Sequence, residues 1–391
     1  MGEGGEGRTP PALSVNAVSL NEEDRRYLAE ALTLAERARG HTHPNPLVGA
    51  LIVKEGRVLG EGYHPRAGEP HAEVFALRQA GEAARGATAY VSLEPCNHTG
   101  RTPPCSLALL QAGVRRVVVA ARDPNPKARG GLEHLRAAGV EVVHAGWDDE
   151  VKEQNLAFFT AVEKGRPFVR LKVAATLDGR VADHEGKSRW ITGPEARGVG
   201  HAFRQSCAAV AVGVGTVLAD DPRLNVRAPD WRAFPWMRVP PPRLEPWKVV
   251  FDTEARTPPG ARIFAGGRVL ILVGEGAPKA RVETLRAAGA EVVLLPRDAA
   301  GRVELRAALA ALLARGLNGL LVEGGPRLAG AFLAAGLVDR VSYFLAPRLL
   351  GEGRGAFSGF TPGLEGAPRL AVRRREALGE DLWMEAELEA S

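Results

Sequence analysis

Three residues with metal-ligating side chains occur at spacings typical of a zinc site. His71 lies at the start of a predicted helix, and Cys96 and Cys105 follow a predicted strand. One imidazole and two thiolates leave the fourth tetrahedral position open for water, which distinguishes a catalytic zinc from a closed structural one. Glu73, two residues from His71, can exchange a proton with that water without binding the ion. The pattern predicts hydrolytic deamination, because H-x-E followed by P-C is the signature of zinc nucleobase deaminases.

Other interpretations of these residues stay open at this point. Each of the three alone could be an unrelated core or surface residue. A closed structural zinc would need a fourth ligand, for which His98 is the sole candidate, and we expect His98 to line a pocket instead. Helix N-termini beside His71 and Cys96 would favour the thiolates.

The first half of the chain alternates between helix and strand patterns around these residues. Residues 1–18 are rich in Gly, Glu and Pro and are expected to form a flexible tail. Asn21 and the acids after it predict the start of a helix. Further predicted elements are strands 47–53, 89–93, 114–121 and 140–143 and helices 71–79 and 132–138. Residues 19–165 are therefore expected to form one layered α/β domain.

Gly165-Arg166-Pro167 breaks the pattern, and a second α/β domain is expected over residues 166–391. Its predicted strands are 168–174, 208–212, 249–252, 269–273, 292–295, 319–323 and 340–346, with more near the C-terminus. Its predicted helices are 194–205, 280–287, 305–314 and 328–334. Residues 228–247, which are rich in Pro and Trp, predict a long irregular loop.

The composition limits the class of protein. With 391 residues, 45% of them apolar and 25% charged, the chain is long enough for two or three folded domains. The net charge of +5 suits anionic small molecules, but no concentrated basic tract indicates nucleic acid as a partner. The longest uncharged apolar run, 207–219, is too short to span a bilayer, and no signal-peptide core is present. We expect a cytoplasmic protein without membrane partners.

The segment 94–105, E-P-C-N-H-T-G-R-T-P-P-C, resembles the deaminase domain of the bifunctional deaminase/reductase family of riboflavin biosynthesis. Eight residues separate its two Cys, whereas cytidine and tRNA adenosine deaminases of the same superfamily usually have two. Matches also occur at 44–49, 62–64, 68–73 and 123–126. The resemblance implies a cytidine-deaminase-like three-layer α/β/α domain whose pyrimidine pocket is lined by Asn45, His64, His98 and Arg101. The family often has Lys at the position of Arg101.

No G-x-G-x-x-G follows a strand in the second half, so a standard Rossmann domain is not expected. Blocks 171–180, 188–193, 215–227 and 322–325 resemble the reductase domain of the same family, which has a dihydrofolate-reductase-like α/β fold and uses NADPH. By that resemblance the cofactor-binding residues are Ala174, Trp190, Thr216, Asp220, Thr253, Gly325, Pro326, Arg327, Leu328, Ala329, Gly330 and Ala331. The substrate-binding residues are Ser188, Arg204, Leu224, Arg227 and Glu323. One departure is Cys207-Ala208, where the family commonly has an acidic residue.

The resemblance implies one enzyme with two consecutive activities on phosphorylated pyrimidines. Zinc hydrolysis would remove an amine from 2,5-diamino-6-(5-phosphoribosylamino)pyrimidin-4(3H)-one, and NADPH would then reduce the ribosyl group of the product to ribityl. Two rivals are a tRNA or nucleoside deaminase with an unrelated second domain, and a non-enzymatic module with a structural metal. The Cys spacing disfavours the first and Glu73 the second. We expect a homo-oligomer, and we interpret His134, His144, His184 and His201 as surface or packing residues and Cys207 as buried.

Overall fold

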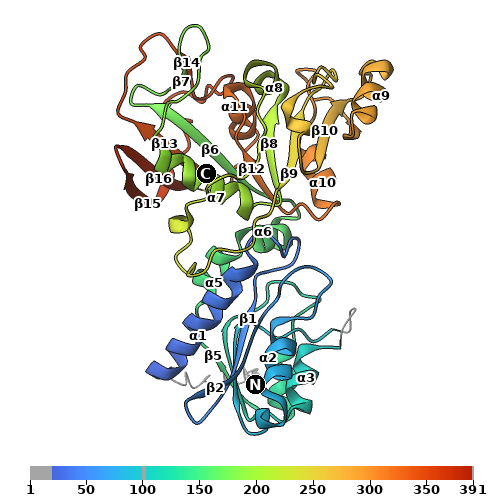
Figure 1. The fold of residues 1–391 in the computed structure, drawn as a ribbon, viewed down its shortest axis with the longest axis vertical. Coiled ribbons are helices and arrows are strands. Elements are labelled where there is room, and N and C mark those ends of the chain that lie inside the picture. The colour runs from blue at the N-terminus through green and yellow to red at the C-terminus, as the bar shows by residue number, and fades with distance from the viewer. Residues whose placement is uncertain (1–19, 99–102, 390–391) are drawn as a thin grey trace, which may run out of the picture.

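The chain forms two bodies, each built on its own β-sheet. The structure, a computed structural model, describes residues 20–98 and 103–389. Figure 1 shows the two bodies stacked along the long axis of the molecule, with the blue-to-cyan residues in one and most of the green-to-red residues in the other. The tail expected over residues 1–18 lies outside the described residues.

The first sheet has five strands in the order β2-β1-β3-β4-β5. The strands are β1 (Gly49–Lys54), β2 (Arg57–Tyr63), β3 (Thr88–Leu93), β4 (Arg116–Ala121) and β5 (Glu141–His144). β1 pairs antiparallel with both β2 and β3, whereas β3, β4 and β5 run parallel. The carboxyl ends of β3 and β4 therefore lie at one edge, where the loops that follow them can meet.

Helices cover both faces of this sheet. The helices are α1 (Glu22–Ala35), α2 (Ala72–Ala80), α3 (Cys105–Gln111), α4 (Gly131–Ala137), α5 (Asp148–Gln154) and α6 (Leu156–Lys164). Along β1, Ala50 and Ile52 pack with α2, α3 and α4, while Leu51 and Val53 pack with α1, α5 and α6. This alternation follows from the period of two in a strand, and it confirms the expected three-layer α/β/α arrangement.

The second sheet has nine strands in the order β11-β10-β9-β8-β12-β6-β13-β16-β15. They are β6 (Phe168–Thr176), β8 (Ala209–Gly213), β9 (Trp247–Phe251), β10 (Val269–Gly274), β11 (Glu291–Leu295), β12 (Gly319–Val322), β13 (Arg340–Ala346), β15 (Leu370–Leu378) and β16 (Asp381–Leu388). The seven strands from β11 to β13 are parallel, and β16 and β15 continue the sheet antiparallel. A short pair, β7 (Arg180–Ala182) with β14 (Arg354–Gly355), lies apart from it.

Helices cover both faces of the second sheet as well. They are α7 (Pro194–Ser206), α8 (Val214–Asp220), α9 (Lys279–Ala287), α10 (Leu305–Leu313) and α11 (Pro326–Ala334). Side chains of α10 and α11 pack on one face, and side chains of α7, α8 and α9 on the other. The expected second α/β domain is confirmed, and ligands of such sheets bind at the carboxyl ends of the parallel strands.

Most elements predicted from the sequence are present within one or two residues of their expected bounds. Asn21 caps α1 by accepting a hydrogen bond from the Asp24 amide at 2.7 Å. The sequence analysis missed β2, α3, α5, α6 and α8, each seven to nine residues long, and the short strands β7 and β14. The predicted irregular loop at 228–247 contains one short 3-10 helix, Trp231–Ala233, before β9 begins.

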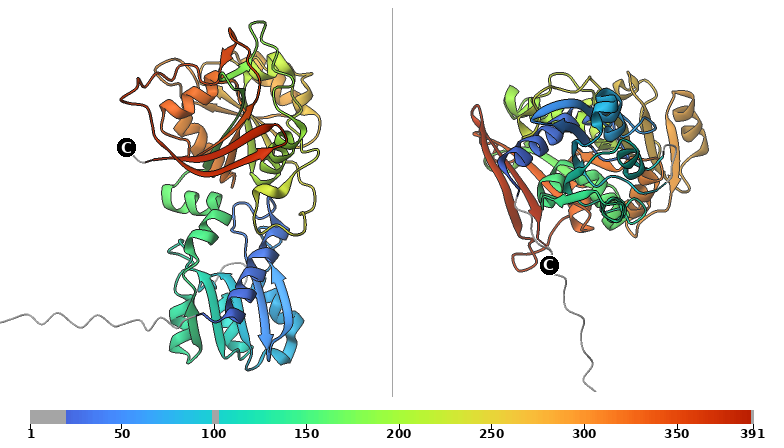
Figure 2. Two further views of the ribbon diagram at one scale, coloured as in Figure 1. Left: turned by 90° about the vertical axis from the view of Figure 1, so that its left-hand side faces the viewer. Right: turned by 90° about the horizontal axis from the view of Figure 1, so that it is seen from below.

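The two bodies meet through the loop after α1, through α5 and α6, and through the loop before β9 (Figure 2). Gly40 allows a close approach here, because a Cβ at its position would lie 2.0 Å from the Gln205 carbonyl oxygen. Arg39 lies with its guanidinium carbon 4.3 Å from the centre of the Phe234 ring. Among the described residues, no helix is long and apolar enough to cross a membrane.

Candidate active sites

His71, Cys96 and Cys105 come together at the carboxyl edge of the first sheet. His71 is the N-cap residue of α2, Cys96 follows β3, and Cys105 is the first residue of α3. The His71 Nδ1 atom lies 3.6 Å from the Cys96 sulfur and 3.3 Å from the Cys105 sulfur. The Cys105 amide at the start of α3 lies 3.5 Å from the Cys96 sulfur, as expected for a helix N-terminus beside a thiolate.

This cluster has the dimensions of a zinc site. Bonds of about 2.3 Å to sulfur and about 2.0 Å to nitrogen, set at a tetrahedral angle, place the N and S atoms about 3.5 Å apart. The three ligand atoms lie within 4.8 Å of one another, and no fourth His, Cys, Asp or Glu of the described chain joins them. The Cys105 thiol and the His71 imidazole lower the pKa of Cys96 despite its burial, so that thiol ionises readily. The donor set and its spacing fit zinc with one position open.

Glu73 lies beside the cluster with an unused carboxylate oxygen. Its side chain is 3% exposed, and its buried Oε2 atom has no hydrogen-bond partner in the part of the chain that the structure describes. Burial raises the pKa of Glu73, which His71 partly opposes. A buried carboxylate without a partner is unfavourable unless another group engages it, which fits a position beside a metal and a substrate.

Two of the expected pyrimidine-pocket residues contact each other. Asn45 Nδ2 donates to His64 Nε2 at 3.1 Å, and His64 Nδ1 donates to the Pro70 carbonyl at 3.1 Å, directly before His71. Burial lowers the pKa of His64, so the neutral ring that these contacts require is favoured. His98 is exposed, and Arg101 lies outside the described residues.

A buried carboxylate fixes the loops behind the cluster. Glu94, at the end of β3, accepts hydrogen bonds from the amides of Asp123 at 3.3 Å and Gly130 at 3.0 Å. These bonds bind the loop after β4 to the segment that carries Cys96. His134, expected at the surface or in packing, donates from Nδ1 at 2.9 Å to Oδ1 of Asn97, the residue next to Cys96 in the sequence.

The second domain contains a cavity of about 1770 Å³ at the carboxyl ends of its parallel strands. Every expected cofactor and substrate residue except Gly330 lines this cavity. Gly330 instead packs against the backbone of Ser358, because a Cβ at its position would lie 2.2 Å from the Ser358 carbonyl oxygen. The cavity joins segments that are far apart in sequence, from Ala174 in β6 to Ala331 in α11.

Hydrogen bonds fix the two loops expected to hold the cofactor. Thr216 Oγ1 in α8 accepts from the Gly325 amide, the N-cap residue of α11, at 3.1 Å. Ser188 Oγ donates to Asp220 Oδ1 at 3.3 Å. Gly215 borders open space, since a Cβ at its position would meet no atom within 4 Å. The first turns of α8 and α11 therefore lie side by side, with open space next to Gly215.

Arg204 and Glu323 form a pair deep in this cavity. Arg204 Nε and Nη2 donate to the two carboxylate oxygens of Glu323, each at 2.7 Å, and Nη1 donates to the Asn225 carbonyl at 2.9 Å. Burial would raise the pKa of Glu323, but Arg204 and Lys172 hold it at about 2. Arg227 is exposed and retains free donors beyond one bond to Asn225 Oδ1 at 3.1 Å.

Several cationic or titratable residues that line the cavity were missed by the sequence analysis, among them Lys172, Arg197 and His201. His201, interpreted as a surface or packing residue, is buried at 8% exposure, and it also lines the cavity with an Nδ1 atom that has no partner among the described residues. Burial lowers its pKa to about 4. A signal was present, since Arg197, His201 and Arg204 are spaced by four and three residues and so share one face of α7.

Comparisons with known proteins agree with both sites. Residues 21–121 match the cytidine and deoxycytidylate deaminase zinc-binding region, and residues 167–384 match the RibD C-terminal domain. The first match contains the His71 cluster, and the second contains the cavity residues from Lys172 to Glu323.

Full-length relatives show the same combination of domains. Riboflavin biosynthesis protein RibD of Aquifex aeolicus is 42% identical over 364 residues, which cover 93% of this chain and 98% of the relative. The structure of Acinetobacter baumannii RibD (form 1) has a TM-score of 0.82 at 38% identity and covers 94% of this chain and 99% of its own. A Thermotoga maritima structure, named a diaminohydroxyphosphoribosylaminopyrimidine deaminase/5-amino-6-(5-phosphoribosylamino)uracil reductase, has a TM-score of 0.81 at 35% identity, with the same coverage of 94% and 99%.

Proposed function

Because the chain belongs to the RibD family of riboflavin-biosynthesis proteins, we propose that it catalyses two consecutive reactions of that pathway. The first is deamination of 2,5-diamino-6-(5-phosphoribosylamino)pyrimidin-4(3H)-one, in which water replaces the amine as a carbonyl oxygen and ammonia leaves. The second is reduction of the ribosyl group to ribityl by NADPH and a proton. The observation that carries the proposal is the presence of two separate sites in one chain: a His-Cys-Cys cluster beside a buried Glu, and a large cavity in the other domain.

In the deaminase site, His71, Cys96 and Cys105 would hold zinc. Zinc would act as a Lewis acid, which makes water a stronger nucleophile near neutral pH. Glu73 accepts a proton from the attacking water and delivers it to the leaving amine, a role that its unpartnered Oε2 supports. Asn45, fixed by its bond to His64, offers its amide oxygen to the pyrimidine, with His98 and Arg101 as further pocket residues.

In the reductase site, the residues around α8 and the start of α11 would hold NADPH, which supplies a hydride. The contacts proposed are Ala174, Trp190, Thr216, Asp220, Thr253 and residues 325–331, although Gly330 faces Ser358 rather than the cavity. Ser188, Arg204, Leu224, Arg227 and Glu323 would bind the sugar phosphate. Because Glu323 and the Asn225 carbonyl already engage Arg204, Arg227 is the better candidate for the phosphate.

The remaining assignments are also part of the proposal. We place the deaminase in residues 19–165 and the reductase in 166–391, since the strands of the two sheets fall at 49–144 and 168–388. We propose phosphorylated pyrimidines, and not nucleic acid, as the partners. The modest net charge of +5 supports this choice. We also propose a cytoplasmic location. A homo-oligomer is supported by the edge strand β15, which exposes Leu370 and Val372. Light scattering of the purified protein would test the oligomer.

The direct test is to incubate the purified protein with the diaminopyrimidine phosphoriboside and to analyse the products by mass spectrometry. Without NADPH the product should have exchanged one amino group for oxygen. With NADPH it should also have gained two hydrogens. Deamination without reduction in the presence of NADPH, or no reaction at all, would contradict the proposal.

A further inference from the structure

The loop that carries Asn45 is bonded to the second domain. Asn318 Nδ2 donates to the Pro44 carbonyl at 2.9 Å, and His43 Nδ1 donates to Asn318 Oδ1 at 2.5 Å. His43 Nε2 lies 3.1 Å from the Ser206 carbonyl oxygen. Asn318 is 1% exposed, and both its side-chain oxygen and its side-chain nitrogen form hydrogen bonds to the loop.

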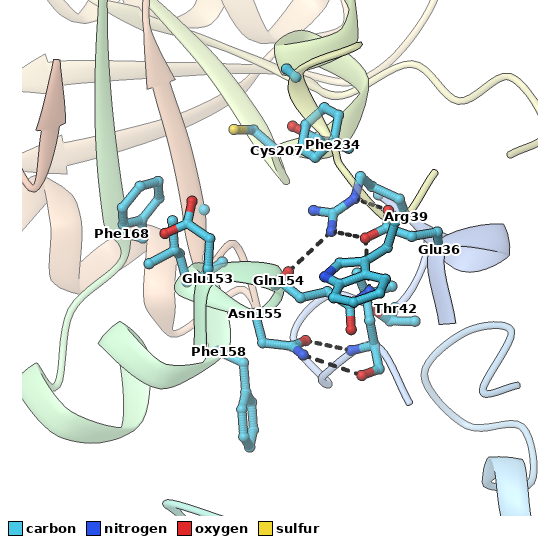
Figure 3. A pocket seen from close by; sticks show the side chains of 18 of the residues that line it. Glu36, Arg39, Thr42, Glu153, Gln154, Asn155, Phe158, Phe168, Cys207 and Phe234 are labelled. Atoms are coloured by element: carbon cyan, nitrogen blue, oxygen red, sulfur yellow. Dashed lines mark hydrogen bonds and ion pairs between the residues drawn. The ribbon is translucent and has the colours of Figure 1, made fainter. Parts of the chain in front are cut away.

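The other contacts of this loop lead to the deaminase site. The Asn45 amide donates to the Thr42 carbonyl at 2.7 Å, and the Asn45 side chain continues to His64. At its far end the loop is fixed within its own domain, because Asn155 Oδ1 accepts from the Leu47 amide at 2.7 Å. Asn155 Nδ2 also donates to the Leu47 carbonyl, and Figure 3 shows both bonds of Asn155 as dashed lines. The loop of residues 42–47 is thus bonded at both ends. Leu47 binds Asn155 of the first domain, and His43 and Pro44 bind Asn318 of the second domain.

The loop borders a cavity between the two domains. This cavity has a volume of about 570 Å³, and Thr42, His43 and Asn45 line it. Figure 3 shows the cavity with Thr42 labelled. Residues of the second domain, among them Phe168 and Phe234, line its opposite wall.

Pro44 and His43 lie against the second-domain backbone, since a Cβ at Gly316 would be 3.4 Å from Pro44 Cδ and one at Gly319 would be 3.5 Å from His43 Cε1. The hydrogen bonds of Asn318 add a directional contact to this packing.

The partners in the second domain belong to elements that also carry the reductase cavity. Ser206 ends α7, which bears Arg204, and Asn318 precedes β12, which leads to Glu323. We infer that His43 and Asn318 are positioning residues for deamination: the reductase domain holds residues 42–47 so that Asn45 faces the pyrimidine. This inference rests on the proposed function, because it takes Asn45 as a substrate contact.

The test uses the full chain with Asn318→Ala and measures both reactions. Loss of two hydrogen bonds to the loop should raise the deaminase KM about fivefold to tenfold, with kcat changed by less than about twofold. Zinc content and the reductase KM should stay at wild-type values. Glu153→Ala is the matched control, because it removes the ion pair between Glu153 and Arg340 across the same interface without touching the loop. Its deaminase KM should be unchanged.

A double-mutant cycle with His43→Ala tests the pairing itself. Once Asn318→Ala is present, adding His43→Ala should raise the deaminase KM little further, since the two side chains act as one unit.

Three results would overturn the inference: an unchanged KM in folded Asn318→Ala, fully additive effects in the cycle, or an equal loss in Glu153→Ala. If Asn318→Ala fails to fold, His43→Gln must show the KM effect alone, or the inference is wrong. A wild-type chain without deaminase activity would overturn the proposed function, and this inference with it.

Discussion

Arg204 and Glu323 form a two-bond ion pair at the base of the second-domain cavity, with both N–O distances at 2.7 Å. Both side chains are mostly buried, and removing one partner of such a pair leaves an uncompensated charge, which typically costs about 3–5 kcal/mol. The pair is therefore a fixed part of the site, and the anionic end of a substrate must find its cation elsewhere.

We propose Arg227 as that cation, and its replacement should then weaken substrate binding selectively. A charge-assisted hydrogen bond contributes roughly 1.5–3 kcal/mol, and about 1.4 kcal/mol corresponds to a tenfold change. Arg227→Ala should therefore raise the reductase KM for the phosphorylated substrate about tenfold or more. Arg227→Lys should recover part of the loss, because it keeps the charge without the two-pronged guanidinium.

Steady-state kinetics with each substrate varied in turn would measure these effects. The NADPH KM and the deamination rate serve as internal controls and should change little. A higher NADPH KM with an unchanged substrate KM would move Arg227 to the cofactor side of the cavity.

The three cysteines should differ in their contribution to bound zinc. Cys96→Ser and Cys105→Ser should lower zinc well below one per chain, because a neutral hydroxyl replaces a thiolate ligand poorly. Cys207→Ser should retain zinc, since Cys207 is buried in the second domain beside the interdomain cavity. Elemental analysis of the purified variants decides the matter, and equal zinc in all three would exclude the ligand set.

His201 should make the stability of the fold sensitive to mildly acidic pH. Its pKa in the folded chain is about 4, below the ordinary value of 6.5, because burial disfavours the charged ring. Between these values the unfolded chain binds a proton that the folded chain does not, so the free energy of unfolding falls as pH falls from 6.5 to 4. His201→Gln should lose less stability over this interval.

Denaturant unfolding at several pH values between about 4 and 7.5 would give the free energy of unfolding of wild type and of His201→Gln. The difference between the two proteins should change as pH falls. Parallel curves for the two proteins would show that His201 does not titrate in this way.

The sequence predicts the ligand cluster well, because His71, Cys96 and Cys105 lie at the ends of regular elements whose order fixes where those ends meet. It does not predict that Glu94 binds the loop at Asp123 and Gly130, since that contact depends on tertiary packing. The pairing of Arg204 with Glu323 is hidden for the same reason, because 118 residues separate them along the chain. The position of His201 beside Arg204 in the cavity could have been inferred from their spacing on one helix face.

The separation of the two activities within one chain is the central claim, and Glu73→Gln tests it most directly. The variant keeps all three ligands and removes only the proton carrier. We predict that it binds zinc at the wild-type level, nearly loses deamination, and reduces previously deaminated substrate with NADPH at the wild-type rate. Loss of zinc, normal deamination, or loss of both reactions together would contradict this account.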